Sequence, residues 1–103
     1  MTRVEALTAL VATLEEELAA LKRFDIDALA AATEQKVVGI GQVAGDWAAD
    51  EVTDEVRLLA EQAQRLNETS RIYVNLMSAN VRRRLDALTG AQAPLYRPSI
   101  AAA

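Results

Sequence analysis

The sequence lacks the side chains on which most enzyme chemistry depends. Its 103 residues include no cysteine and no histidine, which excludes disulfides, thiolate nucleophiles and the most common metal ligand and general base. It also has only four glycines, two prolines, two tyrosines, one tryptophan and one phenylalanine, so residues that favour turns and strands are scarce. We therefore expect no enzymatic activity, no bound metal and no cofactor.

What remains is rich in helix-forming residues. Hydrophobic residues make up 51% of the chain, but 21 of them are alanine, so thirteen leucines, nine valines and four isoleucines must supply most of the core. A chain of this length has room for one domain with a modest core. We predict an all-α fold: an elongated antiparallel helical bundle or hairpin of about three helices over residues 1–90, with one long C-terminal helix, followed by a flexible tail over residues 91–103.

No stretch of the sequence is suited to crossing a membrane. The longest uncharged stretch in the body of the chain runs from Val37 to Gly45, whereas a membrane-spanning helix needs about 20 apolar residues. The N-terminus shows no apolar run followed by a small-residue cleavage site. We expect a cytoplasmic protein with no membrane span.

Charge is distributed unevenly along the chain. Residues 1–55 hold four basic and twelve acidic side chains, whereas residues 56–103 hold three acidic side chains and seven basic ones, all arginine. The net charge of −4 disfavours a nucleic-acid partner. The opposite signs favour a chain that folds back on itself, and the alternative is a basic face that binds an acidic partner.

A first helix is predicted to begin at Thr2. Thr2 and Glu5 have the spacing at which each side chain can satisfy a free amide of a helix start. The three consecutive acids Glu15, Glu16 and Glu17 are interpreted as a solvated face. Apolar residues then recur at alternating steps of three and four, the pattern of a helix that packs along one face: Val4, Leu7, Val11, Leu14, Leu18 and Leu21.

A second helix is predicted from Ile26 to about Asp50. Asp25 suits a break in the chain and the cap of a new helix. Three glycines between residues 39 and 45 weaken a helix, since each costs about 1 kcal/mol relative to alanine. An extended segment over residues 37–41 is the alternative, although a single strand would leave its backbone groups unpaired. The glycines do not have the spacing of a phosphate-binding loop.

The third helix is predicted to be the longest. Thr53 is a cap candidate, and no Gly or Pro follows until Gly90, which gives about 36 residues against about 22 and about 24 for the first two helices. Helices of those lengths cannot cover all of it, so the part beyond about Tyr73 needs another partner. Its apolar stripe comprises Val56, Leu59, Ala63, Leu66, Ser70, Tyr73, Met77, Val81, Leu85 and Leu88.

This uncovered part favours contact with another helix. Leu76, Met77, Val81, Leu85 and Leu88 lie among polar residues and arginines, and a methionine adapts to different partners. An amphipathic partner helix and self-association along the same stripe are both compatible with it. Three consecutive arginines, residues 82–84, fan around a helix, and we interpret them as a solvated helix end rather than a nucleic-acid patch.

Several short stretches share their order and composition with one family of helical proteins. They are Leu14-Glu15-Glu16-Glu17-Leu18-Ala19-Ala20-Leu21-Lys22, Asp27-Ala28-Leu29, Thr33-Glu34-Gln35-Lys36, Leu66-Asn67-Glu68, Asn75, Arg82-Arg83-Arg84-Leu85 and, after a proline, Leu95-Tyr96. Their order resembles that of the FlgN-type flagellar export chaperones, and the resemblance covers nearly the whole chain.

The resemblance implies a cytoplasmic chaperone that binds the C-terminal helices of hook-filament junction proteins. Such a chaperone prevents premature assembly of these clients and hands them to the flagellar type III export apparatus. In this family the C-terminal part of the chain grips the client, with arginines at the rim of the contact. Together with the apolar pattern, this gives the expected partner-binding residues Tyr73, Leu76, Met77, Asn80, Val81, Arg84, Leu88 and Tyr96.

Two other classes of protein are compatible with the sequence. A structural coiled-coil homodimer or adaptor needs only the seam of the first helix. A small secreted helical hairpin of the WXG type has a tryptophan near its central turn, and Trp47 lies at such a place. However, Trp47-Ala48-Ala49 lacks the glycine of that motif, so we rank this class below the chaperone.

Overall fold

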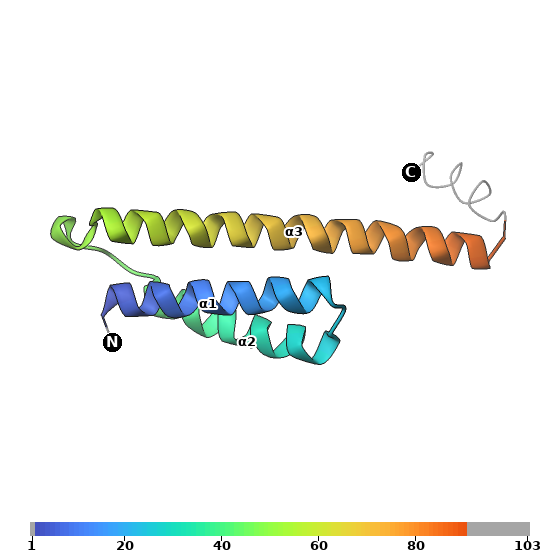
Figure 1. Ribbon diagram of the computed structural model, residues 1–103, viewed down its shortest axis with the longest axis horizontal. Coiled ribbons are helices and arrows are strands. Elements are labelled where there is room, and N and C mark those ends of the chain that lie inside the picture. Colours follow the sequence, from blue (N-terminus) through green and yellow to red (C-terminus); the bar gives the residue numbers. More distant parts are fainter. Residues whose placement is uncertain (1, 91–103) are drawn as a thin grey trace. The chain divides into compact units, whose positions relative to one another are not determined.

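The computed structural model describes residues 2–90 and is all-helical over that range (Figure 1). Its elements are α1 (Arg3–Lys22), α2 (Ile26–Val43), a short 3-10 helix η1 (Ala49–Glu51) and α3 (Asp54–Leu88). The predicted helical bundle with a long last helix is confirmed, and the extended alternative for residues 37–41 is wrong because those residues belong to α2. The expected tail, residues 91–103, lies outside the described residues.

The chain divides into two units. Unit 1 is Met1–Tyr73 and contains α1, α2 and the first part of α3, and unit 2 is Val74–Ala103. The described part of unit 2 is therefore residues 74–90, most of which form the last turns of α3. Among residues 2–90 no helix combines the length and apolar character that a membrane span requires.

Local capping fixes both the start of α1 and the break after it. The Thr2 hydroxyl accepts a hydrogen bond from the Glu5 amide (3.1 Å), and the Glu5 carboxylate accepts one from the Thr2 amide (3.0 Å). After α1, Phe24 adopts a positive φ of 60°, and Asp25 accepts a hydrogen bond from the Ala28 amide (3.0 Å) at the start of α2. The predicted capping box and the predicted break near Asp25 are both confirmed.

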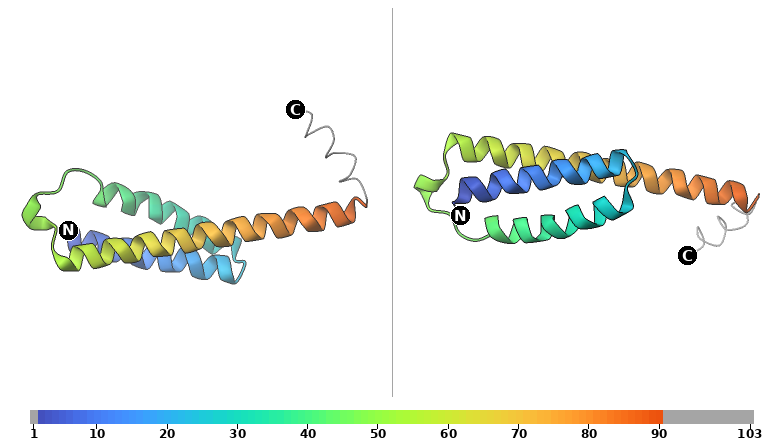
Figure 2. Two further views of the ribbon diagram at one scale, coloured as in Figure 1. Left: turned by 90° about the horizontal axis from the view of Figure 1, so that it is seen from above. Right: turned by 60° about the horizontal axis from the view of Figure 1, so that its bottom comes forward.

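α1 buries a wider face than its heptad pattern predicted. It lies beside α2 and beside the first part of α3, as the right-hand view of Figure 2 shows, so it packs on two sides. Leu10 is buried although it is off the predicted seam, whereas Val4 and Leu18 are only half-buried. The buried residues of α1 are Ala6, Leu7, Leu10, Val11, Leu14, Glu17, Ala20 and Leu21.

Small residues bring α1 and α2 close together. A Cβ atom placed on Gly39 would lie 3.1 Å from Leu10 Cδ1, so the missing side chain makes room for the leucine. Ala32, one heptad earlier, is the other buried residue of α2. α2 ends at Val43 and not near Asp50 as expected, because the chain becomes extended at Ala44 and continues through a positive φ at Gly45.

The core of unit 1 joins α1 to α3. Leu10, Val11 and Leu14 from α1 form a buried cluster with Ala63 from α3. Val43, Leu59 and Leu66 are partly buried against this cluster. α3 begins after Thr53, whose hydroxyl accepts a hydrogen bond from the Val56 amide (3.2 Å), and ends at Leu88, before Gly90 with a φ of 75°. Both predicted ends of this helix are confirmed.

Trp47 and Arg3 connect the segment between α2 and α3 to the start of α1. Its indole Nε1 donates a hydrogen bond to the Val43 carbonyl (3.0 Å), and the Arg3 guanidinium lies 4.4 Å from the ring centroid. Arg3 also donates to the Asp46 carbonyl (2.7 Å) and pairs with Glu51 (3.4 Å). The tryptophan therefore has a packing role within unit 1, in a connection between the second and third of three helices.

Candidate functional site

Unit 2 carries a row of apolar side chains along one face of α3. We call this row the C-terminal stripe: Val74, Met77, Val81, Leu85 and Leu88, at steps of three and four along the helix. Met77 is half-buried and the other four are exposed, up to 84% for Leu88. Since exposed apolar side chains in a continuous row mark interaction surfaces, this stripe is the candidate protein-binding site.

The expected partner-binding residues do not all lie on this stripe. Met77, Val81 and Leu88 belong to it. Leu76 is 62% exposed, but consecutive helical residues point about 100° apart, so it lies off the stripe, beside Met77. Asn80 is exposed and is displaced from Val81 by the same angle.

The other three expected residues have different positions. Tyr73 belongs to unit 1, where it is half-buried with the Lys22 ammonium 5.7 Å from its ring centroid. Arg84 is exposed near one edge of the stripe, and Tyr96 lies outside the described residues. Val74 and Leu85 complete the stripe but were not among the expected partner-binding residues, although the predicted apolar stripe included Leu85 and the spacing of Val74 from Val81 indicates the same face.

The arginines of unit 2 surround the helix unequally. With about 100° between successive residues, Arg84 lies about 60° to one side of the stripe centre, Arg82 about 100° to the other side and Arg83 about 160° away. Within residues 2–90, none of the three is paired with an acidic side chain. Arg84 therefore borders the stripe directly, and Arg82 lies farther round the helix on the other side, where its long side chain can still reach the margin.

A polar network around one buried carboxylate lies in unit 1, and the sequence did not reveal it. Glu17 is only 4% exposed, so its assignment to a solvated face is wrong. Its carboxylate accepts hydrogen bonds from Thr33 Oγ1 (3.2 Å) and Lys36 Nζ (3.2 Å). Lys36 Nζ also donates to Asn67 Oδ1 (3.2 Å), so the network joins α1, α2 and α3. Its polar groups bind one another, which indicates a structural role.

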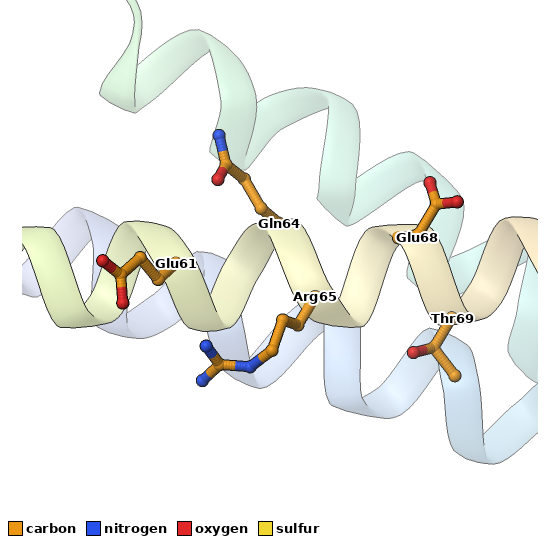
Figure 3. A pocket seen from close by; sticks show the side chains of 5 residues that line it. All are labelled: Glu61, Gln64, Arg65, Glu68 and Thr69. Carbon is orange, nitrogen blue, oxygen red and sulfur yellow. The ribbon is translucent and has the colours of Figure 1, made fainter.

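Two of the hollows in unit 1 differ in size and lining. One of about 190 Å³ is lined by Leu10, Leu14, Lys36, Ile40, Ala63, Gln64 and Asn67. A larger, shallow one of about 450 Å³ is lined by the five polar side chains of Figure 3, which all come from one helix, α3. In the part of the chain that the structure describes, no cluster of His, Cys, Asp or Glu could hold a metal ion.

Comparisons with known proteins identify no relative of this chain: no protein-family model, no curated protein and no solved structure matches it.

Proposed function

We propose that this protein is a helix-binding chaperone of the FlgN type. The observation that carries the proposal is the C-terminal stripe, whose apolar side chains form one continuous row and are mostly exposed. An amphipathic client helix laid along the stripe would remove both apolar surfaces from water. Met77, a flexible side chain within the row, suits a surface that accommodates more than one client.

On this proposal the client is the C-terminal helical region of a hook-filament junction protein. A client helix covered by the stripe is not free to pack against other copies of the client, so binding prevents premature assembly. The chaperone releases the client at the flagellar type III export apparatus and acts in the cytoplasm. The chain itself carries out no chemistry, in keeping with its lack of cysteine and histidine.

The test is binding of the full chain to a junction-protein C-terminal fragment. Val81→Asp or Leu85→Asp places a charge inside the stripe, and we expect either variant to weaken binding by about tenfold or more. Leu58→Asp is the matched control, because Leu58 is a 65% exposed leucine of α3 in unit 1. Equal loss in all three variants, with helix content retained by circular dichroism, would argue against the stripe as the binding site.

A structural homodimer is the second candidate function. The same row of apolar side chains at steps of three and four is the pattern that pairs two identical helices. Sedimentation of the chain alone distinguishes the two candidates. A dimer that dissociates in the Val81→Asp variant supports the homodimer, whereas a monomer that binds the fragment supports the chaperone.

A further inference from the structure

We infer that the C-terminal stripe binds an amphipathic helix with acidic residues along both edges of its apolar face, and not the same stripe of a second copy. The inference rests on the proposed function and adds to it the chemistry of the partner. The observation that supports the inference is that Arg82, Arg83 and Arg84 lie at different angles from the stripe around α3.

Arg82 and Arg84 lie on opposite sides of the stripe. Their long aliphatic stems can cover the margins of an apolar contact while their guanidinium groups remain at its rim. Residues at the two edges of a helix pairing face the edges of the partner and determine which partner is accepted. A partner with carboxylates at both edges would therefore meet a positive charge on each side. Arg83, about 160° from the stripe centre, would meet neither edge.

The same arginines oppose pairing of two identical stripes. Val81 lies at the middle of the stripe, so in an antiparallel pair centred on it the two copies of Arg82 lie within a turn of each other on the same side of the contact, and the two copies of Arg84 face each other across the other side, about 9 Å apart along the axis. An in-register parallel pair also brings like charges together at both edges. Asp86 is the one acidic residue among residues 74–90, and at about 140° from the stripe centre it cannot offset this repulsion.

Neither the composition of residues 91–103 nor the exposed row of α2 supplies an apolar face with two acidic edges. Residues 91–103 contain one arginine and no acidic residue. α2 exposes Ile26, Val37 and Ile40 in unit 1. Asp27 and Glu34 border this row on one side only, because Lys36 lies on the other side. A separate helix with acidic residues at both edges complements the arginines better than either segment does.

Two synthetic helical peptides test the inference against the full chain. Both carry leucine at the a and d positions of three heptads, and they differ only at the flanking positions, which are glutamate in one and lysine in the other. At low salt we expect the affinity of the chain for the glutamate peptide to be at least about tenfold higher than for the lysine peptide. This difference in affinity should decrease as the salt concentration increases. The double variant Arg82→Glu/Arg84→Glu should reverse the order, whereas Arg83→Glu should preserve it.

Each other outcome overturns the inference. Equal affinity for both peptides means that the edges do not select the partner, while helix binding and the proposed function stand. Binding of neither peptide overturns the inference together with the proposed function. A loss of selectivity with Arg83→Glu as large as with the double variant indicates general charge attraction in place of edge recognition.

Sedimentation of the chain without peptide tests whether a second copy of the chain occupies the C-terminal stripe. We expect the wild-type chain to be a monomer. We also expect the fraction of dimer in Arg82→Glu/Arg84→Glu not to exceed that in Arg83→Glu. A wild-type dimer that Val81→Asp dissociates would show that a second copy occupies the stripe, which overturns the inference. If Val37→Asp also dissociates that dimer, its partner surface is the exposed row of α2.

Discussion

Glu17 is a charged residue in the middle of the buried face of α1, and its partners account for its position. Thr33 and Lys36 donate to its two carboxylate oxygens, and Lys36 donates in turn to Asn67 of α3. A buried carboxylate is tolerated only when its hydrogen-bonding capacity is used, so the position of Glu17 depends on residues of the other two helices. The network therefore favours one mutual arrangement of the three helices within unit 1.

Removing one partner of Glu17 should be more damaging than removing the pair. Lys36→Met leaves the carboxylate buried without its cation, and we expect the free energy of unfolding to fall by about 1–3 kcal/mol. In Glu17→Met/Lys36→Met the uncompensated charge is gone, so most of this loss should be recovered. Urea denaturation of the wild type and the two variants measures both effects. A double variant less stable than Lys36→Met would contradict this account.

The caps of α1 and α2 make stability depend on acidity. The Ala28 amide, together with Arg23, lowers the pKa of Asp25, and the Thr2 amide and hydroxyl lower the pKa of Glu5. Since the pKa of each carboxyl is lower in the folded chain, each contributes stability that is present above its unfolded value, about 3.9 for Asp and about 4.3 for Glu. That contribution is lost as the pH falls through the folded pKa.

Asp25→Ala should therefore lower Tm more at pH 7 than at pH 2. At neutral pH the variant loses a charged cap of α2, whereas in acid the wild-type cap is itself protonated and weaker. Asp25→Asn is the control, because it retains a capping oxygen but does not titrate. Thermal unfolding followed by circular dichroism from pH 2 to pH 7 gives the comparison. A constant Tm difference between Asp25→Ala and the wild type over this range would refute the assignment.

At the scale of elements, the two glycines within α2 have different roles. Gly39 is buried and faces Leu10, so even a Cβ atom would be in tight contact there. Gly41 is exposed, and a Cβ atom placed on it would meet nothing within 4 Å. Both weaken the helix as glycines do, but only Gly39 compensates by allowing α1 and α2 to approach closely.

Substitutions at these two glycines should have opposite effects. Gly41→Ala should raise the free energy of unfolding by about 0.5–1 kcal/mol, because alanine favours the helix and meets no obstacle. Gly39→Leu should lower it by about 1–3 kcal/mol through overpacking against Leu10. Denaturant unfolding measures both, and Gly39→Leu/Leu10→Ala should recover part of the loss. If Gly39→Leu were as stable as the wild type, the close approach would not be a constraint.

The sequence predicted those features of the elements that depend on neighbouring residues. The capping residues Thr2, Asp25 and Thr53 act within one turn, so the starts of α1, α2 and α3 could be predicted, as could the end of α3 before Gly90. The end of α2 was missed although Gly45 follows that helix with a positive φ as Gly90 follows α3, because Gly39 and Gly41 lie inside α2 and the sequence does not distinguish them from the glycine that ends it. Glu17 was misassigned because its partners lie 16 and 19 residues away on another helix.

At the candidate site the sequence predicted which face of α3 is apolar, but not which of the expected residues lie on it. The step of three and four residues identified Met77, Val81 and Leu88, and it also marks Val74 and Leu85. Leu76 was included as an apolar residue of the uncovered part and Asn80 through the family resemblance, but a helix turns these short side chains away from that row. No periodicity reveals which side chains another part of the chain will cover, so the half-buried state of Tyr73 beside Lys22 required the structure.

At the scale of the whole molecule, the buried residues of the described range, 2–90, all belong to unit 1. Every buried residue among residues 2–90 lies between Ala6 and Ser70, in unit 1, and none lies in residues 74–90. Helices gain most of their stability in proteins from packing of an apolar face. Residues 74–88 therefore depend more on their own backbone hydrogen bonds than α1 does, and a bound partner helix would supply the packing they lack.

Hydrogen exchange should show this difference between the units. We expect the amides of residues 78–88 to exchange through local opening, about tenfold or more faster than the buried part of α1, which opens only with the global unfolding of unit 1. The glutamate-flanked peptide should slow exchange in residues 74–88 and leave α1 nearly unchanged, because a ligand stabilises the segment that it binds. Exchange measured by mass spectrometry with and without the peptide gives both comparisons. Equal protection of the two segments in the free chain would mean that residues 74–88 are already stabilised by other contacts. That result would contradict the proposal that the C-terminal stripe is free to bind a partner helix.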